Sequence, residues 1–231
     1  MKNYGKFADF ARLRDFLTAA LRQHLYNAAG RSEEEKRYRF EHCLRVAQIG
    51  RRVAEKENLD PQALELGCLL HDIGKWDAKI PVDHGRSGAL TAAKLFAQAD
   101  LPADLCEELA QGIAMHVDGR YNPRTDCAEN EENTAGEKYR FFPKPPTACA
   151  VLIGECDDID RFGTYRICDT LRYWNFLSLS TAKQILQIDS YLARLEQMRG
   201  KTRHSETTRQ LWRENIDYQI GFFSRLRGEI G

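Results

Sequence analysis

The chain has 231 residues, of which 42% are hydrophobic and 29% are charged, as in an ordinary globular protein. Lys and Arg together number 34, as do Asp and Glu, so no net charge indicates a nucleic-acid or membrane-surface partner. No apolar run approaches the roughly 20 residues of a spanning helix, and the charged start lacks the apolar region of a secretory signal. Seven scattered cysteines without a CxxC pair predict reduced thiols in a cytoplasmic protein.

Helical periodicity extends along nearly the whole chain, and we predict an all-α fold. A first amphipathic helix is predicted over 5–25, and a second contains the stretch "RFEHCLRVAQIGRRVAEKENL". The next helix is predicted in "DPQALELGCLLHD", where Asp60 suits the N-cap and Pro61 the first helical position. Two further helices are predicted in "SGALTAAKLFAQA" and "PADLCEELAQGIAMH".

The helical pattern breaks between 117 and 146, a stretch rich in Asn, Glu, Gly and Pro that we interpret as a long loop or insertion. Helix returns in "TACAVLIGECDDIDRF", and C-terminal helices are predicted within 180–230. Ser205 begins the last of these with an S-x-x-T variant of a helix cap. Alternating strand patterns are absent, so we predict a single domain over 1–231: a helical bundle with a C-terminal helical extension.

Four of the six histidines lie in the central helical region, at His42, His71, His84 and His116, and Asp72 directly follows one of them. Farther along, "ECDDID" places several carboxylates on a predicted helix. Neutral imidazole and carboxylate are the usual protein ligands of Zn, Mn, Fe and Ni, and a helical bundle can direct such ligands inward from several helices. Each residue alone is more typical of a packed core or a solvated helix face, but the ordered combination favours a metal site.

These residues follow an H…HD…D pattern, and over 39–166 the chain resembles the HD-domain metal-dependent phosphohydrolase superfamily. The motif segments are "FEHCLRVAQIG", "GCLLHDIGK" and "GECDDIDRFG". They supply, in order, His42, the doublet His71 and Asp72, and a last carboxylate placed at Asp157, with Asp158 as its nearest rival. The resemblance implies the HD-domain helical bundle as the core of the fold.

Two further segments, "VDHGRSGA" and "IAMHVDGR", resemble the bacterial HD proteins that split symmetrical dinucleoside tetraphosphates. This resemblance implies a two-metal site in which Asp72 bridges the ions, with the ligands His42, His71, Asp72, His84, His116 and Asp157. The cyclic-di-GMP phosphodiesterase branch fits less well, because Val117 stands where that branch has a second His and no G-Y-P element is present. The insertion after Gly119 also departs from the compact members of the superfamily.

The resemblance implies hydrolysis of a phosphoester or phosphoanhydride in a small nucleotide-like substrate by a metal-activated water. One or two divalent ions would serve, from Fe, Mn, Ni, Zn or Mg. We assign catalytic roles to Asp72 and Lys75, and substrate binding to Lys75, Arg86 and Arg120, because a phosphate needs cationic partners. Other expected contributors are phosphate-binding Arg161 and Arg166, and Asp77 and Asp83 as acceptors for the imidazoles.

Cysteines and aromatic residues also lie near these motifs in the sequence. Cys43, Cys68 and Cys156 neighbour the ligand-bearing stretches and are expected to be small buried hydrophobes rather than ligands. The aromatic residues near the site suit either base stacking or the core, and they are Trp76, Tyr121, Phe141 and Phe142.

Two other functions use the same ligand set. One is a di-iron oxygenase resembling inositol oxygenase, and the other is a non-catalytic regulatory domain that keeps the metal. Metal requirement and dependence on O2 would separate these functions. No motif names a protein partner, and a homo-oligomer stays possible.

Overall fold

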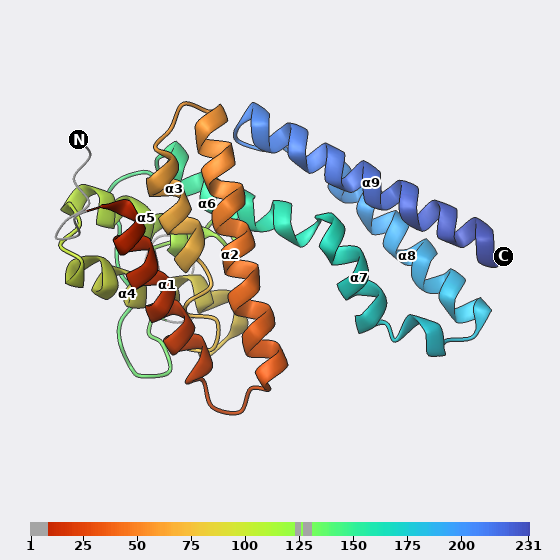
Figure 1. Ribbon diagram of the computed structural model, residues 1–231, viewed down its shortest axis with the longest axis horizontal. Helices are drawn as coiled ribbons and strands as arrows, with labels where there is room; N and C mark the ends of the chain where they lie inside the picture. The colour runs from red at the N-terminus through yellow and green to blue at the C-terminus, as the bar shows by residue number, and fades with distance from the viewer. Residues whose placement is uncertain (1–8, 123–125, 127–130) are drawn as a thin grey trace. The chain divides into compact units, whose positions relative to one another are not determined.

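The computed structural model describes residues 9–122, 126 and 131–231 (Figure 1). Over these residues it contains nine α-helices, two short 3-10 helices and no β-strand. The only extended pairing in this described part is an isolated antiparallel bridge between Glu132 and Lys138. The prediction of an all-α fold is therefore confirmed. None of the described helices combines the length and the apolar character needed to cross a membrane.

The chain divides into two compact units, Met1–Asp157 and Asp158–Gly231. The single domain predicted over 1–231 is not tested by this division and stays a prediction.

The first unit is a bundle of helices whose apolar faces meet in one core. Its helices are α1 (Phe10–Tyr26), α2 (Glu33–Lys56), α3 (Pro61–Leu70), α4 (His84–Gln98), α5 (Ala103–Met115) and the start of α6 (Ala148–Arg161). Figure 1 shows α1 beside α2, and α1 also packs against α3. The stripe Leu13, Leu17, Leu21 and Leu25 recurs every four residues and is fully buried, so one face of α1 covers the core.

Local capping signals fix the starts of the two helices that lead into the histidine motifs. Ser32 and Glu35 form a capping box at α2, in which the Ser32 hydroxyl accepts from the Glu35 amide at 3.2 Å. At α3 the Asp60 carboxylate accepts from the Gln62 amide at 3.0 Å, and Pro61 takes the first helical position. The predicted start of this helix is confirmed.

The segment after α3 requires Gly74 because of close packing and not because of an unusual backbone angle. A Cβ atom at this position would lie 2.2 Å from the backbone nitrogen of Gly88 in α4. Because neither residue carries a side chain, the turn after α3 packs directly on the start of α4, where His84 lies.

The bounds of the first helix differ from the predicted ones. The first helix begins at Phe10 and ends at Tyr26, whereas the prediction was 5–25; residues 5–8 lie outside the described part. In the predicted loop 117–146, the described residues contain no helix, and the remaining ones, 123–125 and 127–130, lie outside the description.

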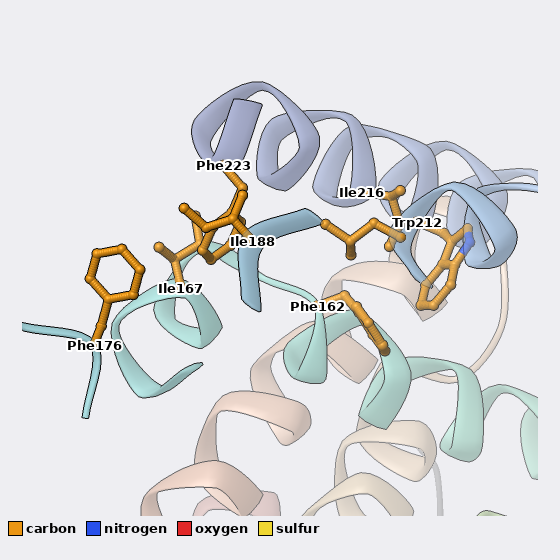
Figure 2. Close-up of a cluster of buried hydrophobic side chains, with 8 residues drawn as sticks. Phe162, Ile167, Phe176, Ile188, Trp212, Ile216 and Phe223 are labelled. Atoms are coloured by element: carbon orange, nitrogen blue, oxygen red, sulfur yellow. The ribbon is translucent and has the colours of Figure 1, made fainter. Parts of the chain in front are cut away.

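The second unit contains α7 (Thr164–Tyr173), α8 (Thr181–Arg199) and α9 (Glu206–Ile230), with a short 3-10 helix η2 (Phe176–Ser178). Helices α8 and α9 pack side by side (Figure 1). The predicted C-terminal helices correspond to them, but α7 was missed, because only Ile167 and Thr170 of its ten residues are buried. Figure 2 shows the unit's own apolar cluster, made by Phe162, Ile167, Phe176, Ile188, Leu195, Trp212, Ile216 and Phe223.

Candidate metal centre

Four imidazoles converge inside the first unit, one from each of four helices or helix ends. His42 lies within α2, His71 is the C-cap of α3, His84 begins α4, and His116 is the C-cap of α5. Their side chains are at most 7% exposed. The Nε2 atoms of His42 and His71 are 3.2 Å apart, and those of His84 and His116 are 3.1 Å apart. The four predicted histidines therefore form two facing pairs.

The Asp72 carboxylate lies between these two pairs. Its Oδ1 is 2.8 Å from Nε2 of His84 and 3.6 Å from Nε2 of His116. Its Oδ2 is 3.7 Å from Nε2 of His42 and 3.6 Å from Nε2 of His71. One carboxylate thus presents a separate oxygen to each pair.

Asp157 completes the group around the first pair. Its Oδ1 is 3.0 Å from Nε2 of His42 and 3.7 Å from Nε2 of His71. Possible ligand atoms of His42, His71 and Asp157 lie within 4.8 Å of one another, and so do those of His71, Asp72 and His116. We call the six residues the His/Asp cluster, whose members are His42, His71, Asp72, His84, His116 and Asp157.

The hydrogen bonds of the imidazoles determine which ring nitrogen carries a proton. In three of the rings Nδ1 contacts the backbone carbonyl three residues earlier in the chain. These pairs are His71 with Cys68 (2.7 Å), His84 with Pro81 (2.5 Å) and His116 with Ile113 (2.7 Å). A carbonyl oxygen can only accept, so Nδ1 donates, and in the neutral ring Nε2 presents a lone pair to the cluster.

This arrangement fits a bound cation. The Nε2 lone pairs of His84 and His116 face each other, and Oδ1 of Asp72 faces the same space. Three acceptors that converge in this way need a positive charge close by, which a metal ion or the neighbouring Lys75 ammonium can supply. Backbone acceptors behind the rings fix their orientation as they do for metal-bound histidines. The residues present therefore have the chemistry and the tautomers that a divalent metal requires.

The protonation states agree with this reading. Burial raises the pKa of the Asp72 carboxyl, but the charge of Arg39 and the contacts with His71, His84 and His116 outweigh burial, so the pKa lies well below the usual range. For Asp157, burial again raises the pKa, and contacts with His42 and His71 outweigh it. Burial lowers the pKa of His84. The cluster thus combines ionised carboxylates with a neutral imidazole, as metal binding needs.

Two cationic side chains lie beside the Asp72 carboxylate. Lys75, predicted from the sequence, has its Nζ 3.7 Å from Oδ1 of Asp72 and 3.3 Å from Nε2 of His84. Arg39, which the sequence analysis missed, donates from Nη1 to Oδ2 of Asp72, and its side chain is 20% exposed. Its spacing from His42, three positions on one helix, was the signal that could have identified it, because such residues share a face.

Arg86 and Arg120, which were predicted to bind phosphate, form ion pairs with nearby aspartates. The Arg86 side chain is 1% exposed, and its Nη1 donates to Asp83 at 2.8 Å while its Nη2 lies 3.4 Å from Asp118. Arg120 donates from Nε to the same Asp118 at 2.8 Å. The guanidinium of Arg86 is therefore enclosed in an ion pair, and we leave both arginines out of the proposed substrate contacts.

The acidic residues expected behind the imidazoles also have other partners. Asp83 pairs with Arg86 as described, and the Asp77 carboxylate lies 2.8 Å from Nε2 of His24, which is outside the His/Asp cluster. Backbone carbonyls take the place that these two carboxylates were expected to fill.

Asp158, the rival for the last ligand, belongs to the second unit. It accepts from Nη1 of Arg203 at 2.8 Å, and Arg161 lies 3.8 Å from it. Arg166 pairs with Asp169 at 2.6 Å. The geometry therefore favours Asp157 over its neighbour, because only Asp157 approaches the histidines.

The cysteines and aromatic residues near the cluster behave mainly as packing groups. The thiols of Cys43, Cys68 and Cys156 are free and buried, and burial raises the pKa of Cys43 far above its usual value. Phe142 is buried with its ring 6.3 Å from that of Tyr121. Arg31 lies over the Trp76 ring, and Phe141 is half exposed.

Comparison with known proteins adds an independent line of evidence. The family model described as "HD domain" matches residues 39–161. A deoxyguanosinetriphosphate triphosphohydrolase-like protein from Thiobacillus denitrificans is 28% identical over 177 residues. That match covers 71% of this chain, which spans only 45% of the relative's length.

Two solved structures share the fold. A predicted HD superfamily hydrolase from an uncultured Thermotogales bacterium has a TM-score of 0.59 at 19% identity, covering 95% of this chain and 94% of its own. Bacillus subtilis YpgQ, in a complex with ADP, has a TM-score of 0.58 at 15% identity, covering 95% and 96%. At these identities the similarity concerns the fold alone.

Proposed function

Because the chain belongs to the HD-domain family, we propose that it is a metal-dependent phosphohydrolase acting on a phosphoester or phosphoanhydride of a nucleotide-like molecule. The observation that carries the proposal is the Asp72 carboxylate, whose two oxygens face two separate pairs of imidazoles. A carboxylate in that position suits the shared ligand of a two-metal centre. Its neighbours in the proposed ligand set are His42, His71, His84, His116 and Asp157.

Each part of the cluster has a role in such a reaction. The residues of the His/Asp cluster would hold a divalent ion, which would supply an acidic water and a positive charge for a phosphoryl oxygen. The carbonyl contacts behind His71, His84 and His116 keep their Nε2 atoms directed at one place. Burial of the cluster strengthens every charge interaction inside it, because the local dielectric is low.

Lys75 and Arg39 supply the positive charge that a phosphoryl group requires. Both lie against Asp72, from opposite sides of its carboxylate: Lys75 near Oδ1 and Arg39 on Oδ2. Cations fixed in place before the reaction stabilise the negative charge that develops on the phosphoryl oxygens. We propose that Lys75 contacts substrate, as the sequence suggested, and that Arg39 takes the role first given to Arg86 and Arg120.

The names of similar proteins support a nucleotide as the substrate class. The Thiobacillus protein is named for a deoxynucleoside triphosphate, and the YpgQ structure contains a nucleoside diphosphate. The motifs around His84 and His116 resemble the dinucleoside tetraphosphate hydrolases. All three kinds of nucleotide therefore belong in the substrate panel.

The test combines metal analysis with phosphate release. Protein purified without added metal is analysed for its elements, and it is then assayed on that panel with Mn, Fe, Ni, Zn and Mg. We expect about two ions per chain when both imidazole pairs are filled, and phosphate release that stops when the metal is removed. The Asp72→Ala variant should lose both the metal and the activity while keeping its helical content.

Two results would contradict the proposal. Bound iron with O2 consumption and no phosphate release would favour the oxygenase chemistry that uses the same ligands. Full phosphate release by Asp72→Ala would show that the shared carboxylate is not part of the machinery.

A further inference from the structure

A cavity lies in the first unit, between helices α1, α2 and α3 and apart from the His/Asp cluster. Its volume is ≈ 520 Å³, within the range of pockets that hold small molecules. None of its lining residues belongs to the cluster. The residues that define its chemistry are Phe10, Arg14, Gln48, Arg51, Arg52 and Glu65.

Glu65 organises the wall of this cavity. Its side chain is 3% exposed, and its carboxylate accepts from Nε of Arg14 at 2.5 Å and lies 3.4 Å from Nη1 of Arg51. A buried carboxylate is stable only when it is paired. Glu65 therefore fixes one guanidinium from α1 and one from α2 at the cavity before any ligand arrives.

Most guanidinium donors at the cavity are not used by these contacts. Arg14 donates to Glu65 only through its Nε. Arg52 donates only through its Nε, to the carbonyl of Gln48 at 3.3 Å. The terminal nitrogens of both make no hydrogen bond or ion pair with any residue that the structure describes. A guanidinium offers a planar fork of donors that matches phosphate oxygens.

Three arginines and two carboxylates, those of Asp15 and Glu65, line the cavity. Arg51 is already paired, since its Nη1 lies 3.4 Å from Glu65 and its Nε donates at 3.2 Å to Glu55, which lies outside the lining. Arg52 makes no ion pair with any residue that the structure describes, so its charge is available to an anion. Phe10 adds an apolar wall at the start of α1.

We propose that this cavity binds a phosphorylated small molecule of nucleotide size through Arg14, Arg51 and Arg52. The site is separate from the His/Asp cluster but shares its helices. Arg51 follows His42 by nine residues on α2, which is about 14 Å along a helix. Glu65 precedes His71 by six residues, on the helix that His71 caps. Helices α2 and α3 therefore connect the anion site to the pair of His42 and His71.

The proposal is tested by titration calorimetry on the full chain, with sodium pyrophosphate and with ATP. EDTA is present, so neither turnover nor a bound metal contributes, and circular dichroism checks that the helices are retained. We expect saturable binding of about one anion per chain. If ATP binds more tightly than pyrophosphate, the nucleoside contributes to binding. If both bind equally well, the phosphates alone are recognised. Both outcomes agree with the proposal.

Variants locate the anion. Arg52→Glu reverses a charge at an exposed residue without breaking an ion pair, so it should fold normally and weaken pyrophosphate binding by about tenfold or more. Arg14→Gln should weaken it as well. Arg12→Glu is the matched control, because Arg12 lies on α1 but does not line the cavity; its binding should change by less than about twofold.

Three results would overturn the inference. One is unchanged binding in Arg52→Glu, and another is an equal loss in Arg12→Glu, which would indicate general surface attraction. The third is loss of binding in a His42→Ala variant with full binding in Arg52→Glu, which would place the anion at the His/Asp cluster. Because the assay measures binding without metal, its outcome does not depend on whether the chain hydrolyses phosphate.

Discussion

His84 and His116 face each other through their Nε2 atoms, 3.1 Å apart, although each ring donates its Nδ1 proton to a backbone carbonyl. When both rings are neutral they cannot hydrogen-bond to each other, since neither facing nitrogen then carries a proton. Such a pair suits the binding of one positive ion.

Replacement of the neighbouring carboxylates separates the two candidates for the last ligand. Asp157→Asn should lower metal affinity by about 100-fold or more, because a buried ligand beside His42 is lost. Asp158→Asn is the matched control, since its carboxylate pairs with Arg203 instead, and it should leave metal affinity unchanged. Metal titration with a competing chelator measures both. The reverse order of effects would assign the ligand to Asp158.

Lys75→Gln should reduce phosphate release while leaving the metal bound. The ammonium lies beside the cluster without being a ligand, so its loss removes charge stabilisation from the reaction, at a cost of about 100-fold in kcat. Lys79→Gln removes an equal charge four residues farther on, where the lysine pairs with Glu132, and it should have little effect. Equal phosphate release by Lys75→Gln and Lys79→Gln would show that Lys75 has no role in the reaction.

Arg86→Met should destabilise the protein. Its guanidinium is enclosed, and its removal leaves the fully buried Asp83 carboxylate without this partner. Breaking a buried pair costs about 3 kcal/mol or more of the free energy of unfolding. Arg120→Met removes the more exposed partner of Asp118 and should cost about 1 kcal/mol or less. Urea unfolding measures the free energy of unfolding of both variants. A similarly small loss in both would contradict a stabilising buried ion pair between Arg86 and Asp83.

Gly74→Ala should be destabilising in spite of the small change. The added Cβ would meet the backbone of Gly88, so α4 must shift, and we expect a cost of about 1–3 kcal/mol. His84 would move with α4, and metal affinity should fall as well. Gly221→Ala, in the open on α9, should instead stabilise the helix by about 0.5–1 kcal/mol. Thermal unfolding and metal titration measure these effects. An unchanged stability and an unchanged metal affinity of Gly74→Ala would show that the close contact with Gly88 is unimportant.

The sequence was informative where the relevant signal is local. Helix starts such as the Asp60 cap depend on a few adjacent residues, and the structure confirms that start. The convergence of the histidines followed from motifs that each lie at a helix or a helix end. The resemblance to the HD superfamily, which the family match confirms, supplied the expected set of ligands.

Pairings between distant segments could not be predicted in the same way. Arg86 lies in the motif around His84, and besides the nearby Asp83 it contacts Asp118, which is 32 residues away in the sequence. Asp77 likewise meets His24, 53 positions earlier, rather than a cluster histidine. The choice among several available partners is decided by tertiary packing, and a linear sequence does not encode it in any short pattern.

The carbonyls of Cys68 and Ile113 belong to the last turns of α3 and α5, where no further amide of the helix can reach them. His71 and His116 satisfy these carbonyls with their own rings, and so they serve as side-chain caps of the very helices that present them. The same hydrogen bond therefore ends the helix and orients the ring. An asparagine in place of His71 or His116 could keep the hydrogen bond to the carbonyl but would remove the imidazole from the cluster. If either helix end frayed, its histidine ring would lose its fixed orientation.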